Sequence, residues 1–111
     1  AVPVLTAAKS GDKMALDKAL ADWYDNAKEI AQFLTSANPK NWPATATEPM
    51  MKAHIDQTTA YAVDLLKNDY TNAVIHFDAA RQHMVEMGTI LASGIIKQFP
   101  DKFKEEKFKK K

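Results

Sequence analysis

The sequence predicts an all-α protein: an up-and-down antiparallel bundle of three long helices, followed by a short C-terminal helix. Along three long stretches, apolar residues recur at spacings of three and four, as on one face of a helix. Only three of the 111 residues are glycine, and no stretch alternates apolar and polar residues as a strand does. A chain of this length, with 46% hydrophobic and 26% charged residues, is expected to form one folded domain.

We expect three segments: a flexible N-terminal arm (1–11), the helical bundle (12–100) and a basic tail (101–111) that forms a short helix or stays disordered. The first bundle helix should run from about 12 to 37, with Asp12 or Ser10 as its cap. It should end at Asn38, because a residue before proline disfavours the helical conformation. Its core stripe comprises Leu16, Leu20, Trp23, Ala27, Ile30 and Leu34.

The second helix should follow a proline-rich loop at 38–49 and run from about 48 to 67, with Thr47 as its cap. Trp42 lies inside the loop, and we expect its large apolar ring to fold back over the end of the core. The core stripe of the second helix comprises Met51, Ile55, Thr58, Ala62 and Leu65.

The third helix, from 70 to 99, is the longest, and a tight Asn68-Asp69 turn makes it an antiparallel neighbour of the second. It carries two apolar stripes, so we predict that it is the central helix, with neighbours on two sides. The first stripe, taken as the core seam, comprises Tyr70, Val74, Phe77, Arg81, Met84, Gly88, Leu91 and Ile95. The second comprises His76, Ala80, His83, Met87, Ile90 and Gly94.

One chain does not provide a cover for the second stripe. The third helix spans about 45 Å at 1.5 Å per residue, and the second helix is about ten residues shorter. We therefore expect a homodimer that completes a larger bundle, with His76, Ile90 and Gly94 in its interface. Arg81 interrupts the first stripe and lies level with Asp56 across the hairpin, so we predict that these two form a structural ion pair.

The same hairpin register predicts a cluster of histidines and methionines. His54 should lie level with His83, and Met50 and Met51 level with Met87. Thioethers favour Cu(I) and imidazole suits copper, so a copper site is one interpretation; a b-type haem held by a His/Met pair is another. Methionine is also a common core filler, and the alternative is a structural or protein–protein interaction domain without a cofactor.

Composition argues against several other classes. The chain has no cysteine, which excludes disulfides and thiolate sites, and it has no phosphate-binding loop or nucleophile motif, so we do not expect an enzyme. A single arginine argues against nucleic-acid binding. No apolar run is long enough to span a membrane. The tail holds six lysines against three acids and could touch an anionic surface.

Four motifs carry a resemblance to a known family. They are His54-Ile55-Asp56-Gln57, Asp69-Tyr70-x-x-Ala73, His83-Met84, and the run from Gly94 to Phe103. The stretch 50–103 resembles a repeated helical domain of secreted Bacillus-type proteins, which often follows a module labelled copper amine oxidase-like. The resemblance implies an extracytoplasmic helical domain of poorly defined activity, with histidines at the positions of His54 and His83. Longer members look like two such halves in tandem, which adds to the expectation of a dimer; the copper label belongs to the neighbouring module.

Overall fold

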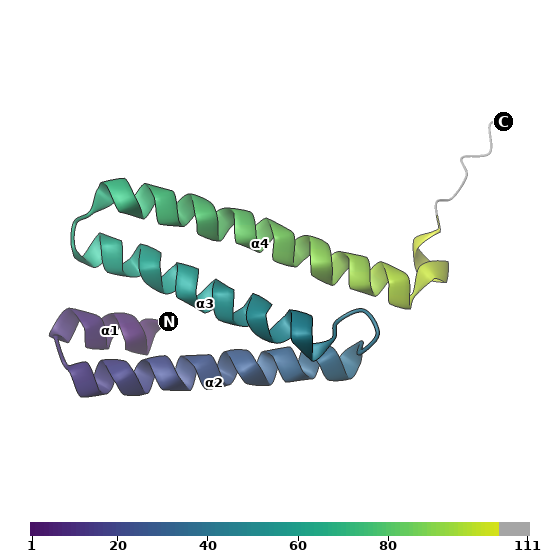
Figure 1. The fold of residues 1–111 in the computed structure, drawn as a ribbon, viewed down its shortest axis with the longest axis horizontal. Coiled ribbons are helices and arrows are strands. Elements are labelled where there is room, and N and C mark those ends of the chain that lie inside the picture. Colours follow the sequence, from purple (N-terminus) through teal and green to yellow (C-terminus); the bar gives the residue numbers. More distant parts are fainter. Residues whose placement is uncertain (105–111) are drawn as a thin grey trace.

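The computed structural model describes residues 1–104, and every regular element in that range is a helix (Figure 1). The all-α prediction is therefore confirmed. The elements are α1 (Val2–Ser10), α2 (Lys13–Ala37), α3 (Ala44–Leu66), α4 (Tyr70–Gln98) and a short 3-10 helix, η1 (Pro100–Phe103). Residues 105–111, most of the predicted basic tail, lie outside the described range.

The three long helices lie side by side as one antiparallel layer (Figure 1). Helix α3 packs against both α2 and α4, whereas α4 packs along its length on α3 alone among the long helices of residues 1–104. The molecule measures 65 × 31 × 20 Å and has a radius of gyration of 18.4 Å, where a compact domain of about 100 residues has about 13 Å. The fold is thus an open layer of helices.

The prediction that the third long helix is central is wrong, because α3 occupies that place. The two stripes of α4 are also reversed relative to the expectation. The stripe that contains Met87 and Gly94 is the inner one: both residues are buried, as is Ala73 beside them, and Gly94 lies against Trp42. The stripe that begins at Tyr70 is exposed: Tyr70 keeps 62% of its surface and Val74 keeps 69%. Small residues on the inner stripe let the two helix backbones approach closely, which favours this side for packing.

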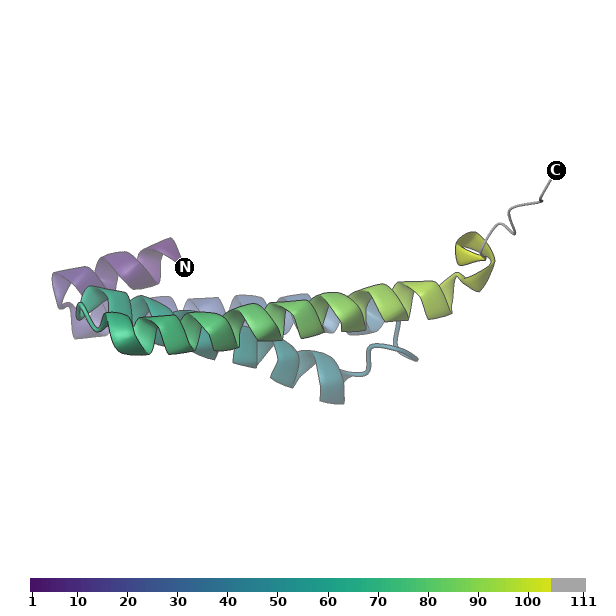
Figure 2. The same ribbon diagram turned by 90° about the horizontal axis from the view of Figure 1, so that it is seen from above.

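The expected flexible arm is instead helix α1, so that prediction is wrong as well. Val4 and Ala7 are buried, because α1 folds back over α2 and α3. Gly11 ends α1 with a φ of 73°, a left-handed conformation that suits glycine. Asp12 then caps α2 as predicted, and its carboxylate accepts a hydrogen bond from the Ala15 amide at 3.0 Å. Seen from above, α1 lies at the same end as the α3–α4 turn, and η1 lies at the opposite end (Figure 2).

Helix α3 begins four residues earlier than expected, at Ala44, with Pro43 in the capping position. The prediction that Thr47 is the cap is wrong. Thr47 is almost completely buried, and its hydroxyl lies 2.9 Å from the hydroxyl of Thr35 on α2. A residue with this role contributes to the packing of two helices, and its hydroxyl is satisfied inside the protein.

Trp42 folds back over the core as predicted. Only 6% of its surface is exposed, and its indole Nε1 donates a hydrogen bond to the Ile90 carbonyl at 3.2 Å. The neighbouring Asn38 is also buried, and its amide nitrogen donates to the Gly94 carbonyl at 2.9 Å. The loop between α2 and α3 therefore closes on the C-terminal half of α4.

Within residues 1–104, no helix combines the length and the apolar character that crossing a membrane would require.

Candidate functional site

The α3–α4 turn fixes how the two helices face each other. Asn68 adopts a φ of 58°, a left-handed conformation that asparagine tolerates, and Asp69 caps α4 by accepting from the Asn72 amide at 3.2 Å. The rings of Tyr61 and Phe77 then meet with centroids 5.4 Å apart, close to the register expected from the sequence. This register decides which side chains of the hairpin lie level.

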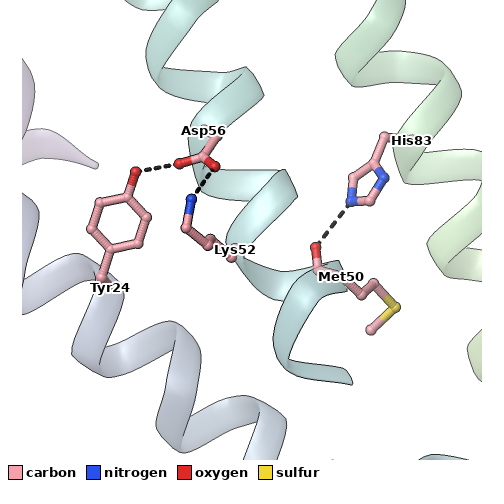
Figure 3. A network of polar contacts seen from close by, with 5 residues as sticks. All are labelled: Tyr24, Met50, Lys52, Asp56 and His83. Atoms are coloured by element: carbon pink, nitrogen blue, oxygen red, sulfur yellow. Dashed lines mark hydrogen bonds and ion pairs between the residues drawn. The ribbon is translucent and has the colours of Figure 1, made fainter. Parts of the chain in front are cut away.

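His54 and His83 come close together on this hairpin. Burial lowers the pKa of His54, and the nearby charge of His83 lowers it further. The ring of His83 points across to α3, where its Nε2 lies 3.0 Å from the Met50 carbonyl (Figure 3). Because a carbonyl can only accept, Nε2 donates this hydrogen bond, and Nδ1 is the nitrogen that carries the lone pair when the imidazole is neutral.

The methionines named with these histidines differ in their surroundings. Met50 and Met87 are buried on facing helices, and Met51 is partly exposed on α3. The level thus holds two imidazoles and buried thioethers. Among residues 1–104, no group of three or more histidine, cysteine, aspartate or glutamate side chains is placed to hold a metal ion. Any ion held here would therefore depend on soft thioether ligands beside the imidazoles.

The predicted ion pair between Arg81 and Asp56 is wrong. Arg81 is exposed and binds Asp78 one turn away, with Nε at 3.1 Å and Nη2 at 2.9 Å. Asp56 lies on the side of α3 that faces α2, where it accepts from the Tyr24 hydroxyl and from Lys52 Nζ at 2.6 Å (Figure 3). Because the Arg81 stripe faces solvent, its guanidinium needs no partner from α3.

Tyr24 is a residue that the sequence did not single out. Its hydrogen bond to Asp56 raises the pKa of Tyr24 to about 12. The pKa of Asp56 is lowered, first by the hydrogen bond from Lys52 and then by that from Tyr24. A tyrosine next to the core-stripe residue Trp23 was a weak sequence signal for such a link. The contact ties α2 to α3, and it leaves Asp56 ionised at neutral pH.

Two of the three residues of the predicted dimer interface, His76 and Gly94, have partners within their own chain. His76 forms an ion pair with Asp64 of α3, and the backbone of Gly94 packs against the indole of Trp42. The Ile90 carbonyl accepts the indole hydrogen bond, although its side chain keeps 43% of its surface. Of the three residues, Gly94 is buried, whereas the side chains of His76 and Ile90 keep part of their surface exposed.

The other apolar stripe of α4 is largely exposed, and we call it the outer seam. It comprises Tyr70, Val74, Phe77, Arg81, Met84, Gly88, Leu91 and Ile95. The spacing alternates strictly between four and three, which is the heptad pattern of helices that pair along their length. Phe77 keeps 51% of its surface and Met84 keeps 46%. Monomeric proteins rarely expose so continuous an apolar strip, and such strips mark interaction sites.

Two open hollows adjoin the Tyr70 end of the outer seam. One, of about 240 Å³, lies between α3 and α4 and is lined by Tyr61, Leu65, Tyr70, Ala73, Val74 and Phe77. The other, of about 490 Å³, lies between α1 and α3 and shares Tyr61 and Leu65 with the first. The apolar surface therefore continues from the outer seam over α3 to Leu5 of α1.

Comparison with protein-family models, with curated proteins and with solved structures found no match to this chain. The function is therefore argued from the geometry of the chain itself.

Proposed function

We propose that this domain is a helical interaction module, and that the outer seam of α4 docks an apolar helix. The observation that carries the proposal is the exposure of five large apolar residues of a heptad seam on a helix whose adjacent face already packs on α3. The fold leaves most of the outer seam exposed, although the Phe77 ring also meets the Tyr61 ring of α3 at its edge. Docking of a helix into such a strip is a recurrent mode of protein recognition.

The apolar area on the outer seam is large enough to drive association. The exposed fractions of its apolar side chains correspond to roughly 500 Å², since a whole large side chain offers about 150–250 Å². Covering that area is worth on the order of 12 kcal/mol before the cost of association, which removes much of it. Binding in the micromolar range or tighter is therefore expected for a helix that fits.

The test uses a fluorescent peptide with the sequence of residues 69–99 and measures its anisotropy as intact protein is added. We expect saturable binding to the wild type and none to the Val74→Glu/Phe77→Glu variant. The matched control, Gln82→Glu/Thr89→Glu, places the same charge on a different side of α4 and should bind like the wild type. Equal binding to both variants, or no binding to the wild type, would refute the proposal.

A second function is favoured by the orientation of His83. We propose that His54 and His83, with Met50, Met51 and Met87, hold a soft metal ion such as Cu(I). The Met50 carbonyl fixes the His83 ring and leaves Nδ1 as the ligand atom, as outer-shell hydrogen bonds do in metal sites. Since this carbonyl occupies Nε2, a small ion suits the position better than the iron of a b-type haem. The extracytoplasmic location implied by the resemblance belongs to this proposal, and fractionation of cells that produce the protein would test it.

Competition with a colorimetric Cu(I) chelator tests the metal proposal. The wild type should withdraw one equivalent of Cu(I) from the chelator, and His54→Ala/His83→Ala should withdraw none. His76→Ala is the control, because His76 lies on the same helix but is paired with Asp64. If the double variant competes as well as the wild type, the two histidines hold no metal.

A further inference from the structure

We infer that the occupant of the outer seam is a second copy of this chain, packed antiparallel along α4 about a two-fold axis. The inference rests on the proposed function and names the partner of the same surface. Three observations support it: the sizes of the residues that would pair, the charges that would meet, and the area that would be buried.

The outer seam consists of two interleaved sets of four residues, one every seven positions. The first set comprises Tyr70, Phe77, Met84 and Leu91, and the second comprises Val74, Arg81, Gly88 and Ile95. A two-fold axis between residues 82 and 83 brings every member of one set level with a member of the other. The resulting pairs are Tyr70 with the partner's Ile95, Val74 with the partner's Leu91, Phe77 with the partner's Gly88, and Arg81 with the partner's Met84. The outer seam is therefore fully used, as an interface between identical surfaces requires.

The sizes of the paired residues fit. Gly88 has no atom within 4 Å of the position that a Cβ would take, so its surface is open. The antiparallel arrangement places the ring of Phe77 over this opening. The guanidinium of Arg81 is drawn aside by Asp78, which leaves the aliphatic part of its side chain to pack on the partner's Met84.

A parallel pair of the same helices fits poorly. It would place Arg81 against the partner's Arg81, and Gly88 against the partner's Gly88. The first contact brings like charges together, and the second leaves a void in the interface. In the antiparallel pair, the one acid flanking the outer seam, Asp78, lies near the partner's Val85, and no like charges meet.

The apolar residues of the outer seam supply more than half of the area that a stable dimer needs. Helix α4 has 29 residues, and at 1.5 Å per residue it is about 43 Å long. Its apolar side chains offer roughly 500 Å², and the stem of Arg81 and the flanking residues add to this, against about 800 Å² per partner in a stable interface. The hollow of about 240 Å³ beside Tyr70 receives the partner's Ile95 in this arrangement.

The chain has no cysteine, so single cysteines can report the arrangement. Phe77→Cys and Gly88→Cys proteins are purified separately, mixed, and oxidised mildly, and disulfide dimers are separated on a non-reducing gel. We expect cross-linked dimers in the mixture and none with either protein alone, because like positions lie about 16 Å apart along the axis, beyond the reach of a disulfide. In the control, Thr89→Cys replaces Gly88→Cys. Residue 89 is adjacent in sequence but lies on another side of α4, so this protein should not cross-link with Phe77→Cys.

Each outcome is decisive. Cross-links within Phe77→Cys alone would show a parallel pair, which overturns the antiparallel arrangement while the outer seam remains an interaction surface. Self-association would be overturned if three results came together. These are no cross-link in the mixture, no cross-link between Val74→Cys and Leu91→Cys proteins, and a monomeric wild type. Binding of the 69–99 peptide would then still show that the outer seam docks a helix, and its absence would refute the proposed function as well.

Discussion

Adding one methyl group to α4 should have opposite effects at its two glycines. A Cβ on Gly94 would lie 2.1 Å from Nε1 of Trp42 and 2.5 Å from its Cε2, well inside van der Waals contact. The indole cannot easily move away, because it is buried and holds the Ile90 carbonyl. A Cβ on Gly88 would meet nothing within 4 Å.

The magnitudes follow from these contacts. Overpacking costs about 1–3 kcal/mol, and loss of the indole hydrogen bond adds about 1 kcal/mol. The better helix propensity of alanine returns about 1 kcal/mol at either site. Gly94→Ala should therefore lower the free energy of unfolding by about 2 kcal/mol, and Gly88→Ala should raise it by up to about 1 kcal/mol. At about 4–8 °C per kcal/mol, a difference of up to about 3 kcal/mol should separate the melting temperatures of the two variants by up to roughly 12–24 °C.

Thermal unfolding followed by circular dichroism at 222 nm measures both variants against the wild type. The protein concentration must be the same and low, because Gly88 lies in the outer seam and dimerisation would shift its melting temperature. Tryptophan fluorescence provides a second readout, since the environment of Trp42 should change only in Gly94→Ala. Equal melting temperatures for the two variants would refute the placement of Trp42 on Gly94.

Three further substitutions test the packing of α2, α3 and α4. Tyr24→Phe removes the hydrogen bond to Asp56 and should lower the free energy of unfolding by about 1 kcal/mol at pH 7. Because the pKa of Tyr24 is raised, the contribution of this hydrogen bond is present below pH 10 and is lost towards pH 12. Because the pKa of Asp56 is lowered, the same contribution is also lost below about pH 4. Urea unfolding across this range checks it, and an unchanged pH profile in Tyr24→Phe would contradict it. Because the pKa of His54 is lowered, the wild type should lose stability as the pH falls below about 6.5, and His54→Gln should reduce that loss. Plots of the free energy of unfolding against pH that run parallel for the two proteins between pH 7 and 5 would disprove this. Asn38→Ala removes a buried donor to α4 and should cost about 1–3 kcal/mol in urea unfolding, and a change below 0.5 kcal/mol would contradict its role.

The helices themselves could be predicted from the sequence, because their apolar residues recur at helical spacing and their ends carry recognisable signals. Asp12 and Asp69 cap α2 and α4 as expected. The position of Trp42 was predictable too, since a large apolar ring in a short loop has few other places to be buried. Helix α1 was missed, because nine residues are too few to show a clear periodicity.

Periodicity could not decide which stripe of α4 packs on α3, because both stripes are apolar. The decision depends on shape: Ala73 and Gly94 allow close packing on the inner side, whereas Tyr70 and Phe77 are bulky. This single reversal had two consequences for the predictions. It placed Arg81 inside the protein, where it would have needed Asp56, and it placed the partner surface on residues that contact their own chain.

The levels of residues along the hairpin were easier to predict than their directions. The register brought His54 level with His83, and the structure places the two imidazoles close enough for their charges to interact. The hydrogen bond from His83 to the Met50 carbonyl was not predictable, since it depends on how each helix is rotated about its axis.

The molar mass in solution tests the central claim, that the outer seam of α4 pairs with a second copy, most directly. Light scattering coupled to size exclusion should give twice the chain mass of 12.4 kDa for the wild type, and 12.4 kDa for Val74→Glu/Phe77→Glu with unchanged helical content. A wild-type mass of 12.4 kDa at every concentration up to about 100 µM, where an interface of this area should be occupied, would contradict the claim.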